Sequence, residues 1–470
     1  MRVAIGVVAA VCAVPATVAG LHAASAALDR HDRGRAATPA EPGGPADFLT
    51  TNTPYRPDAV LGSYGPAPAG FVPGFTEMIA RHGARALGDE DDIVFLEQVI
   101  AQAQAAGKVK PLANDLLTEL KSLDAANRKL GFGALSALGK QEHADLGARL
   151  VQRLPDLFAK AAPTGRRVTV VNSGIPRAAD SGAAFTAAMT SALPSLKPLV
   201  KKPVADTRTL YFHKEPVNAD YATYVKHDAT LNATLKKITY SKESDKDAVT
   251  CLGALFADDF VGRLASDGYT FTDSDGKKQT RNAVDATIAL FNVYAITPGL
   301  SREGVWHFDR FIDRKTAEHF AFVDDATTFY EKGPGLSGST ITFKMASVLE
   351  DDFFHAVAAY RSGTSTDVAR LRFAHAETII PLAALMRLPG SEVQVPRTDT
   401  FSPSRNPWRG ANVAPYAANM QWDVFRNGSG QVLIRMLYNE KETHFKSECK
   451  PFTAGSYFYD FTELQRCYGR

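Results

Sequence analysis

Two arginines, a histidine and a glycine stand together in Arg81-His82-Gly83-Ala84-Arg85, directly after the apolar segment FTEMIA (75–80). Charged groups are seldom buried without a partner, and a planar guanidinium matches the oxygens of a phosphate group. A neutral imidazole among them could attack phosphorus, and a glycine lets the backbone approach closely. The cluster is therefore compatible with a phosphate site. By itself it is equally compatible with a surface loop whose arginines form ion pairs.

Two other apolar segments also end in chemically useful side chains. Arg177 follows RVTVVNSG (167–174), and His375 and Glu377 end LRFAHAE (371–377). The three segments together supply three guanidiniums, two imidazoles and a carboxyl group. Phosphomonoester hydrolysis needs such groups, because oxygen charge must be stabilised, a nucleophile must attack and an acid must protonate the leaving alkoxide. Three arginines can neutralise a phosphate, so no metal or other cofactor is expected, and no CxxC pair or HExxH motif occurs.

Each of these segments has the same plan of an apolar run, a polar stretch and then a helical pattern. Repeated strand–loop–helix units predict an α/β sheet whose polar residues gather at the carboxyl ends of the strands, where ligands bind. Helical patterns dominate residues 196–335, which predicts an inserted, mostly helical cap domain, and KGPGLSG (332–338) returns the chain to the core. The core is then 47–195 plus 336–470. A helix is expected over about 341–360, and a hairpin across Asn427-Gly428.

The N-terminus has the pattern of an export signal. Arg2 precedes an apolar run, Val3–Leu21, and small residues follow at 24–26. We therefore predict a signal peptide over 1–26 and a secreted or periplasmic protein. The alternative is a retained membrane anchor, which Pro15 and the lack of stop-transfer charges disfavour. Residues 27–46 are rich in Pro, Gly, Ala and charge, and are predicted to be a disordered leader.

Cysteines and net charge limit the remaining possibilities. In an exported chain, Cys449 and Cys467 are expected to form a disulfide, while Cys251 is expected to be a buried thiol. The 53 basic and 51 acidic residues give a net charge of only +2. No global field would recruit nucleic acid or an anionic membrane, so any anion must be recognised by a local cluster.

Three motifs carry a resemblance to a known family. RHGAR resembles the RHGxRxP motif of histidine phosphatases, although Leu87 stands where that family has proline. SGIPRAADSGAAF resembles the segment that bears the family's third phosphate-binding arginine, and RFAHAETII resembles the HAE signature. The chain is thus similar to the acid phosphatase and phytase branch of the histidine phosphatase superfamily, most of all to multiple inositol-polyphosphate phosphatases. The similarity covers most of residues 70–450 and is weakest in the inserted segment.

The resemblance implies a fold and a role for each motif residue. The implied fold is α/β, with a mixed central sheet flanked by helices and an inserted helical domain. His82 would be the nucleophile that forms a phosphohistidine, and Glu377 the proton donor. Four residues would hold the phosphoryl oxygens, namely Arg81, Arg85, Arg177 and His375. Each role has a simpler alternative: an ion pair at a helix start for Arg177, a favourable charge at a helix start for Glu377, and a core histidine for His375.

The substrate class also follows from the resemblance. It implies an exported enzyme that acts as a monomer on inositol polyphosphates such as phytate, without nucleic acid or, after signal cleavage, a membrane as partner. A polyphosphate would require further basic side chains, for which the candidates are Lys197, Lys201, Lys202, Arg208, Lys214 and Lys226. Two other readings stay open: a broad acid phosphatase or sugar-phosphatase on the same scaffold, and a non-catalytic protein that binds a phosphorylated ligand.

Overall fold

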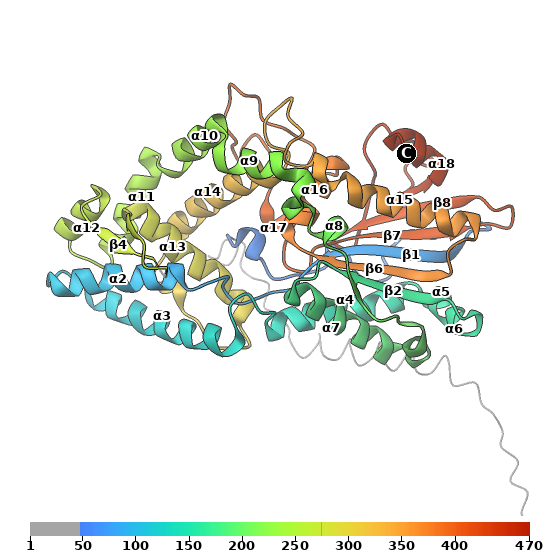
Figure 1. Ribbon diagram of the computed structural model, residues 1–470, viewed down its shortest axis with the longest axis horizontal. Coiled ribbons are helices and arrows are strands. Elements are labelled where there is room, and N and C mark those ends of the chain that lie inside the picture. Colours follow the sequence, from blue (N-terminus) through green and yellow to red (C-terminus); the bar gives the residue numbers. More distant parts are fainter. Residues whose placement is uncertain (1–47, 274) are drawn as a thin grey trace, which may run out of the picture.

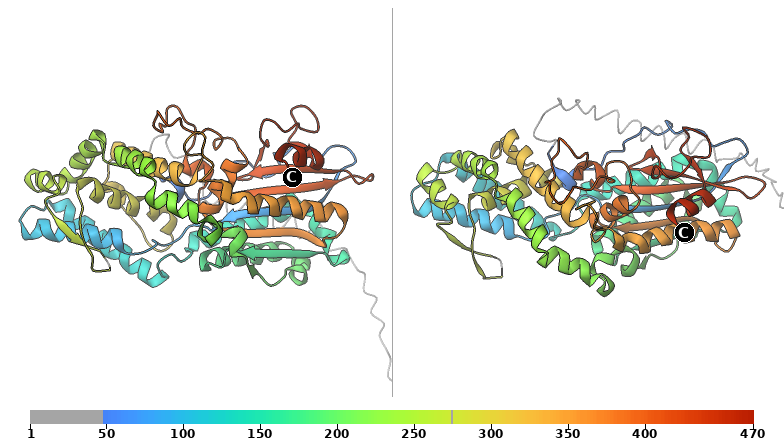
Figure 2. Two further views of the ribbon diagram at one scale, coloured as in Figure 1. Left: turned by 45° about the horizontal axis from the view of Figure 1, so that its top comes forward. Right: turned by 90° about the horizontal axis from the view of Figure 1, so that it is seen from above.

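The computed structural model describes residues 48–273 and 275–470. The predicted signal peptide (1–26) and disordered leader (27–46) lie outside the described residues. A sheet covered by helices on both faces forms one side of the molecule, and a group of helices forms the other (Figure 1). The turned views in Figure 2 show the same two parts side by side.

The central sheet has eight strands, seven of them in the order β10-β8-β7-β1-β6-β2-β3, with β9 paired to β8. Strands β1, β6, β2 and β3 run parallel to their neighbours in that series, whereas β7, β8, β9 and β10 pair antiparallel. The mixed sheet with flanking helices confirms the predicted fold class. The strand bounds are β1 Val72–Arg81, β2 Arg167–Asn172, β3 Val204–Ala205, β6 Asp367–Ala374, β7 Asn419–Arg426, β8 Val432–Tyr438, β9 Lys441–Thr443 and β10 Phe458–Asp460.

The three predicted strands are β1, β2 and β6, and they lie next to one another in the sheet. Every residue of β6 but one is buried. Strands covered on both faces are expected to be continuously apolar, which is why these segments could be recognised without an alternating pattern. The predicted hairpin is also confirmed, because β7 pairs with β8 across the turn at 427–431.

Helices cover both faces of the sheet and bury its side chains. On one face, Met78, Leu146, Val170, Phe185 and Phe373 belong to one apolar core. This face carries α4 (Ala137–Arg153), α5 (Pro155–Ala159), α6 (Ala161–Thr164), α7 (Pro176–Ala192) and the 3₁₀ helix η3 (Pro194–Leu199). The other face carries α8 (Thr207–Leu210), α15 (Ser347–Ser362), α16 (Ala376–Leu385) and α18 (Phe461–Tyr468). Helix α15 corresponds to the helix predicted near 341–360.

The second part of the molecule is built around α13 (Ala283–Ile296), in which most residues are buried. Its other helices are α2 (Asp91–Ala105), α3 (Pro111–Leu130), α9 (Ala219–His227), α10 (Ala229–Thr239), α11 (Lys242–Gly253), α12 (Asp258–Ala265) and α14 (Arg314–Lys332), with a small hairpin of β4 (Thr270–Thr272) and β5 (Lys278–Thr280). Helix α2 packs against α13 and α3 packs against α2, although both precede β2 in the chain. The division of the chain at 196–335 stays a prediction. Helices α2 and α3 lie outside those bounds but pack with the helices of the inserted segment.

Short elements complete the chain. They are η2 (Thr50–Asn52), η4 (Phe212–Lys214), η5 (Pro216–Asn218), η6 (Thr297–Leu300), η7 (Phe308–Arg310), η8 (Lys344–Ala346) and α17 (Gly410–Val413). Among the described residues, the stretch Ala283–Leu300 is long and apolar enough to cross a membrane, but 78% of it is buried. Such burial is expected of the core helix of a folded domain.

The cysteines lie as predicted. Cys449 and Cys467 form a disulfide with their Cα atoms 5.4 Å apart, which ties the segment after β9 to α18. Cys251 is a buried free thiol in α11.

Candidate active site

The strand order brings the three polar segments to a single edge of the sheet. In β1, Arg81 pairs with Ala374 of β6, and on the other side of β6 Phe373 pairs with Asn172 of β2. Because the three strands are parallel, their carboxyl ends point the same way. Arg81 and His82 therefore lie beside His375, and the loop leading to Arg177 lies on the far side of it.

His82 is buried at the centre of this edge. The centroid of its ring lies 5.4 Å from that of His375. Its Nδ1 lies 2.8 Å from the carbonyl oxygen of Gly83. A carbonyl can only accept, so Nδ1 carries the hydrogen and Nε2 keeps a free lone pair. Burial, together with the charges of Arg81 and its neighbours, holds the pKa of His82 well below its usual range. The imidazole is neutral and can act as a nucleophile.

Arg81 does not fit the surface-loop alternative. Its side chain is buried, and Nη1 donates to the carbonyl oxygens of Thr51 and Ala414. The guanidinium carbon lies 4.7 Å from the ring centroid of Tyr416. Burial lowers the pKa of Arg81 to about 10, so the group is still charged near neutrality. A buried guanidinium held by carbonyls retains its positive charge and favours an anion next to it.

Arg85 and Arg177 add charge to the same place. Both lie close enough to His82 for their charges to lower its pKa, after burial and the charges of Arg81 and His375. Arg177 stands in the first turn of α7, which Pro176 begins with the φ angle that a helix start requires. The Nε atoms of Arg81 and Arg177 are buried and have no hydrogen-bond partner among the described residues. A phosphate oxygen is an acceptor that such N–H groups can use.

His375 lies between β6 and α16 and is fully buried. Its Nε2 is 2.7 Å from the Oγ of Ser173, while Nδ1 is buried and lacks a hydrogen-bond partner in the described part of the chain. Burial and then the charge of Arg177 lower the pKa of His375 to about 3, so this ring is neutral as well. In a purely structural core histidine, both ring nitrogens would have hydrogen-bond partners. The free Nδ1 of His375 does not fit that alternative.

Glu377 lies in the first turn of α16 and is paired with a residue that the sequence did not indicate. Its Oε1 lies 2.9 Å from the Nζ of Lys332, the last residue of α14. Burial alone would raise the pKa of Glu377, but the Lys332 charge and hydrogen bond outweigh it and hold the pKa well below its usual range. The carboxyl group is therefore ionised. His213, buried in η4, is a second neighbour of Glu377, but burial lowers its own pKa to about 4, so its ring is uncharged near neutral pH.

The loop after β1 is held by close contact with the start of α4. A Cβ added to Gly83 would lie 2.4 Å from the carbonyl oxygen of Gly139. The carboxylate of Glu142, also in α4, accepts from the backbone N–H of Ala84 at 2.7 Å and from that of Tyr55 at 2.8 Å. Because neither glycine has a side chain, the loop packs directly against α4, and this close packing positions His82 relative to that helix.

This contact predicts the effect of Gly139→Ala. The new Cβ would lie 2.1 Å from the carbonyl oxygen of Ala84, so the loop or the helix must move. Overpacking of this kind costs roughly 1–3 kcal/mol, which we expect to lower the Tm by several degrees and phosphate release by about tenfold or more. The matched control is Gly262→Ala in α12, where an added Cβ meets no atom within 4 Å. Equal Tm and turnover in the two variants would contradict the proposed packing.

Leu87, the departure from the family motif, is accommodated by a side chain of α3. Its backbone N–H donates to the Oδ1 of Asn127 at 2.8 Å, and Asn127 in turn donates to the carbonyl oxygen of Leu123 at 2.8 Å. Proline has no N–H, so this bond exists only because the residue is not proline. The loop is anchored by a hydrogen bond in place of a ring.

The six basic residues proposed for further substrate contacts are all exposed. Of these, Lys214 is next to His213 and its charge lowers the pKa of that histidine, after burial and the opposing charge of Glu377. The contacts of the described residues bring Lys332, rather than those six, to the carboxyl group of Glu377.

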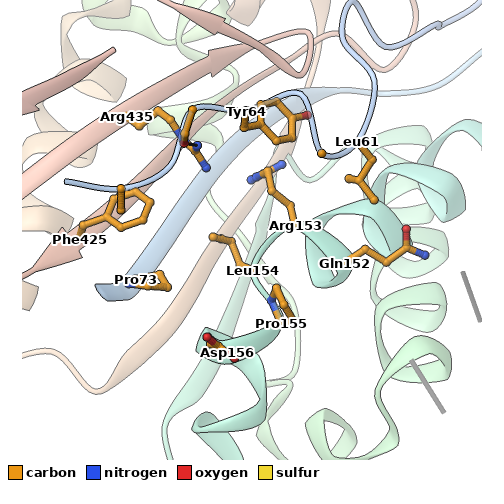
Figure 3. A pocket seen from close by; sticks show the side chains of 13 residues that line it. Leu61, Tyr64, Pro73, Gln152, Arg153, Leu154, Pro155, Asp156, Phe425 and Arg435 are labelled. Atoms are coloured by element: carbon orange, nitrogen blue, oxygen red, sulfur yellow. Dashed lines mark hydrogen bonds between the residues drawn. The ribbon is translucent and has the colours of Figure 1, made fainter. Parts of the chain in front are cut away.

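A cavity of about 400 Å³ near Pro73 and Phe425 also contains arginines (Figure 3). Pro73 stands at the start of β1, whereas His82 follows its end. The arginines are already paired, because Asp423 lies 3.0 Å from an Nη2 of Arg153 and 2.9 Å from an Nη2 of Arg435. This cavity is therefore not the phosphate site.

Comparison with known proteins places the site within a family. Residues 75–439 match the histidine phosphatase superfamily (branch 2). The chain belongs to this superfamily. It is thus a histidine phosphatase, and the resemblance inferred from RHGAR and HAE is confirmed. The matched residues include all six site residues. A search of curated proteins finds no match.

Solved structures agree with the family assignment. A multiple inositol polyphosphate phosphatase of Bifidobacterium longum, in complex with inositol hexasulfate, is 32% identical, with a TM-score of 0.85 over 90% of this chain and 97% of that one. The same protein in complex with phosphate is 31% identical, with a TM-score of 0.86 over the same shares. The phytase of D. castellii is 14% identical, with a TM-score of 0.64 over 93% of this chain and 89% of that one, and shares the fold.

Proposed function

We propose that this histidine phosphatase is an exported phosphomonoesterase that hydrolyses inositol polyphosphates such as phytate through a phosphohistidine. The observation that carries the proposal is the neutral His82, whose Nδ1–H is bound to Gly83 and whose charged neighbours include three arginines. Such a site binds a dianion and offers it a nitrogen lone pair. Export rests on the pattern of residues 1–26, and a monomer without a cofactor is part of the same proposal.

In the first step, the lone pair of His82 Nε2 attacks phosphorus. A P–N bond forms, the ester P–O bond breaks, and its electron pair leaves with the ester oxygen. The carboxyl group of Glu377 gives its proton to that oxygen, so an alcohol leaves. Arg81, Arg85 and Arg177 stabilise the three remaining oxygens of the phosphoryl group, and His375 donates from a ring nitrogen.

In the second step, water attacks the phosphohistidine. A P–O bond forms, the P–N bond breaks, and its electron pair returns to Nε2. The Glu377 carboxylate accepts a proton from the water. Inorganic phosphate leaves, and both His82 and Glu377 return to their starting states. His82 thus accepts and then releases the phosphoryl group, and Glu377 first donates and then accepts a proton.

The substrate class is supported by the similar Bifidobacterium longum protein, whose structure carries inositol hexasulfate. A broad acid phosphatase or sugar-phosphatase would use the same six residues, and only the surroundings of the phosphate pocket would differ. A non-catalytic binding protein is less well supported, because Leu87 leaves the loop anchored through Asn127 and every reacting group is present.

The test compares phytate with small monoesters and follows the intermediates by chromatography. We expect kcat/KM for phytate to exceed that for β-glycerophosphate by at least about tenfold, because the extra phosphates meet further cations. A rapid quench into alkali, in which a phosphoramidate bond survives, should trap phosphate on His82. Equal rates on both substrates would favour the broad phosphatase. Binding of phytate with neither turnover nor a trapped phosphoryl group would favour the binding protein.

A further inference from the structure

The ion pair of Lys332 with Glu377 joins the inserted segment to the phosphatase core. Lys332 ends α14, and Glu377 stands in the first turn of α16. The Nζ–Oε1 distance is 2.9 Å, and the two side chains are only 25% and 32% exposed. The bond is thus largely shielded from solvent, and Glu377 Oε1 holds a cation before any substrate arrives.

This pairing conflicts with the role of a proton donor. Three positive charges act on Glu377 and favour its ionised form: Lys332 of α14, Arg81 at the end of β1 and Arg177 of α7. Glu331 of α14 opposes them. The neighbouring His213 of η4 and His375 before α16 have pKa values lowered to about 4 and about 3 and are neutral, and Tyr221 of α9 is a further titratable neighbour. The carboxylate is therefore unprotonated in the free protein. To protonate a leaving oxygen, Glu377 must first gain a proton when the substrate binds.

We propose that Lys332 makes this proton uptake depend on a second phosphate of the substrate. A phosphate adjacent to the scissile one draws the ammonium group of Lys332 away from Glu377, and Glu377 then takes up a proton from solvent. Lys332 is thereby a positioning and specificity-determining residue of this active site. The inference rests on the proposed function, in which Glu377 is the acid.

The geometry of the reaction requires the second phosphate to come close. Glu377 must touch the leaving oxygen, which is attached to the substrate ring. In an inositol polyphosphate, the neighbouring ring carbon bears the next phosphate. Lys332 already touches Glu377, so that phosphate falls within reach of its flexible side chain. An ammonium group carries three donors and is not restricted to one planar geometry, so it can exchange a carboxylate for a phosphate dianion.

A monoester with a single phosphate lacks this competitor. Lys332 then stays on Glu377, and the carboxyl group stays ionised except at low pH. The device would thus favour polyphosphates at the chemical step, in addition to any gain in binding. Loss of one cationic partner and the arrival of a dianion both favour the protonated acid.

The first test is calorimetric and needs no turnover. Inositol hexasulfate is the probe, because its sulfates do not titrate between pH 4 and 8. In the wild-type protein at pH 6, we expect the binding of hexasulfate to take up about one proton. The number of protons is measured from the change in binding enthalpy between buffers of different ionisation enthalpy. Uptake should vanish in Glu377→Gln, and inorganic sulfate should cause none. Binding of hexasulfate with no proton uptake would overturn the inference while leaving the proposed function intact.

The second test is kinetic and uses Lys332→Met. Without Lys332 the pKa of Glu377 rises, so the acid keeps its proton to higher pH. The upper limb of kcat/KM for β-glycerophosphate should move up by about one pH unit or more, while kcat/KM for phytate falls by about tenfold or more. If Lys332 had only a structural role, the substitution would lower kcat/KM for both substrates and would not move the upper limb of the pH profile for either. An unmoved limb would overturn the inference, whereas a wild-type protein inactive on every phosphomonoester would overturn the proposed function instead.

The matched control is Lys108→Met. Lys108 pairs with Asp259 between the end of α2 and the start of α12, with side chains 38% and 64% exposed. The Lys108→Met substitution removes one positive charge, as Lys332→Met does, but from a part of the helical region that lies away from Glu377. We expect the pH limbs and the preference for phytate to match those of the wild type.

Discussion

His82→Ala is expected to abolish phosphate release from phytate, with kcat reduced by about four orders of magnitude or more. The residue supplies the only lone pair that the proposed first step uses. His375 cannot replace it, because its Nε2 is engaged with Ser173 and, in that step, its Nδ1 carries the hydrogen that it donates to the phosphoryl group. The measurement is initial phosphate release under saturating phytate. The alkaline quench described above should also find no trapped phosphoryl group.

Two observations separate this loss from misfolding. His307→Ala is the matched control, since His307 is an exposed histidine paired with Glu119 in the helical part of the molecule, and it should retain full activity. His82→Ala should still bind inositol hexasulfate, because all three arginines remain. Turnover like that of the wild type in His82→Ala would eliminate the phosphohistidine mechanism.

The parts of this site that could be predicted from the sequence are those that local physics determines. Strands β1, β2 and β6 are buried between two layers of helices, so they appear as mainly apolar runs, interrupted by Glu77 in β1 and by Arg370 and Arg372 in β6. Parallel strands end at one edge, so the polar residues after them must meet. This reasoning reaches Arg81, His82, Arg177, His375 and Glu377 without any contact being known. The structure brings them together.

The parts that could not be predicted depend on which surfaces meet. The apolar stripe of α2 is visible in the sequence, but the pattern does not reveal that α13, about 190 residues later, covers it. Lys332 was assigned only to a glycine-rich return segment, because a single lysine before Gly-Pro-Gly carries no chemical signal. Its partner lies 45 residues further along. Long-range pairing of this kind follows from the packing of α14 on the core.

Glu377→Gln tests the remaining chemical role. Glutamine preserves the shape of the side chain but has no proton to give to a leaving alkoxide. We expect kcat/KM for phytate, which reports the first step, to fall by about a hundredfold to ten-thousandfold. For p-nitrophenyl phosphate, kcat/KM should fall less than about tenfold, since its phenolate leaves without strong acid assistance. The measurement is kcat/KM on both substrates at one pH, and an equal loss on both would remove Glu377 from the role of acid.

The ion pair makes this experiment harder to interpret than a usual removal of an acid. Glutamine leaves the largely buried ammonium of Lys332 without its carboxylate, and an unpaired charge in such a place is itself costly. The double variant Glu377→Gln/Lys332→Met removes both charges, and its comparison with Lys332→Met isolates the missing proton. If the acid role is correct, kcat/KM of the double variant for phytate stays far below that of Lys332→Met, while its kcat/KM for p-nitrophenyl phosphate stays close to that of the wild type. If the stranded lysine were the cause of the defect, kcat/KM for phytate would rise to that of Lys332→Met, and the proton would have to come from another group.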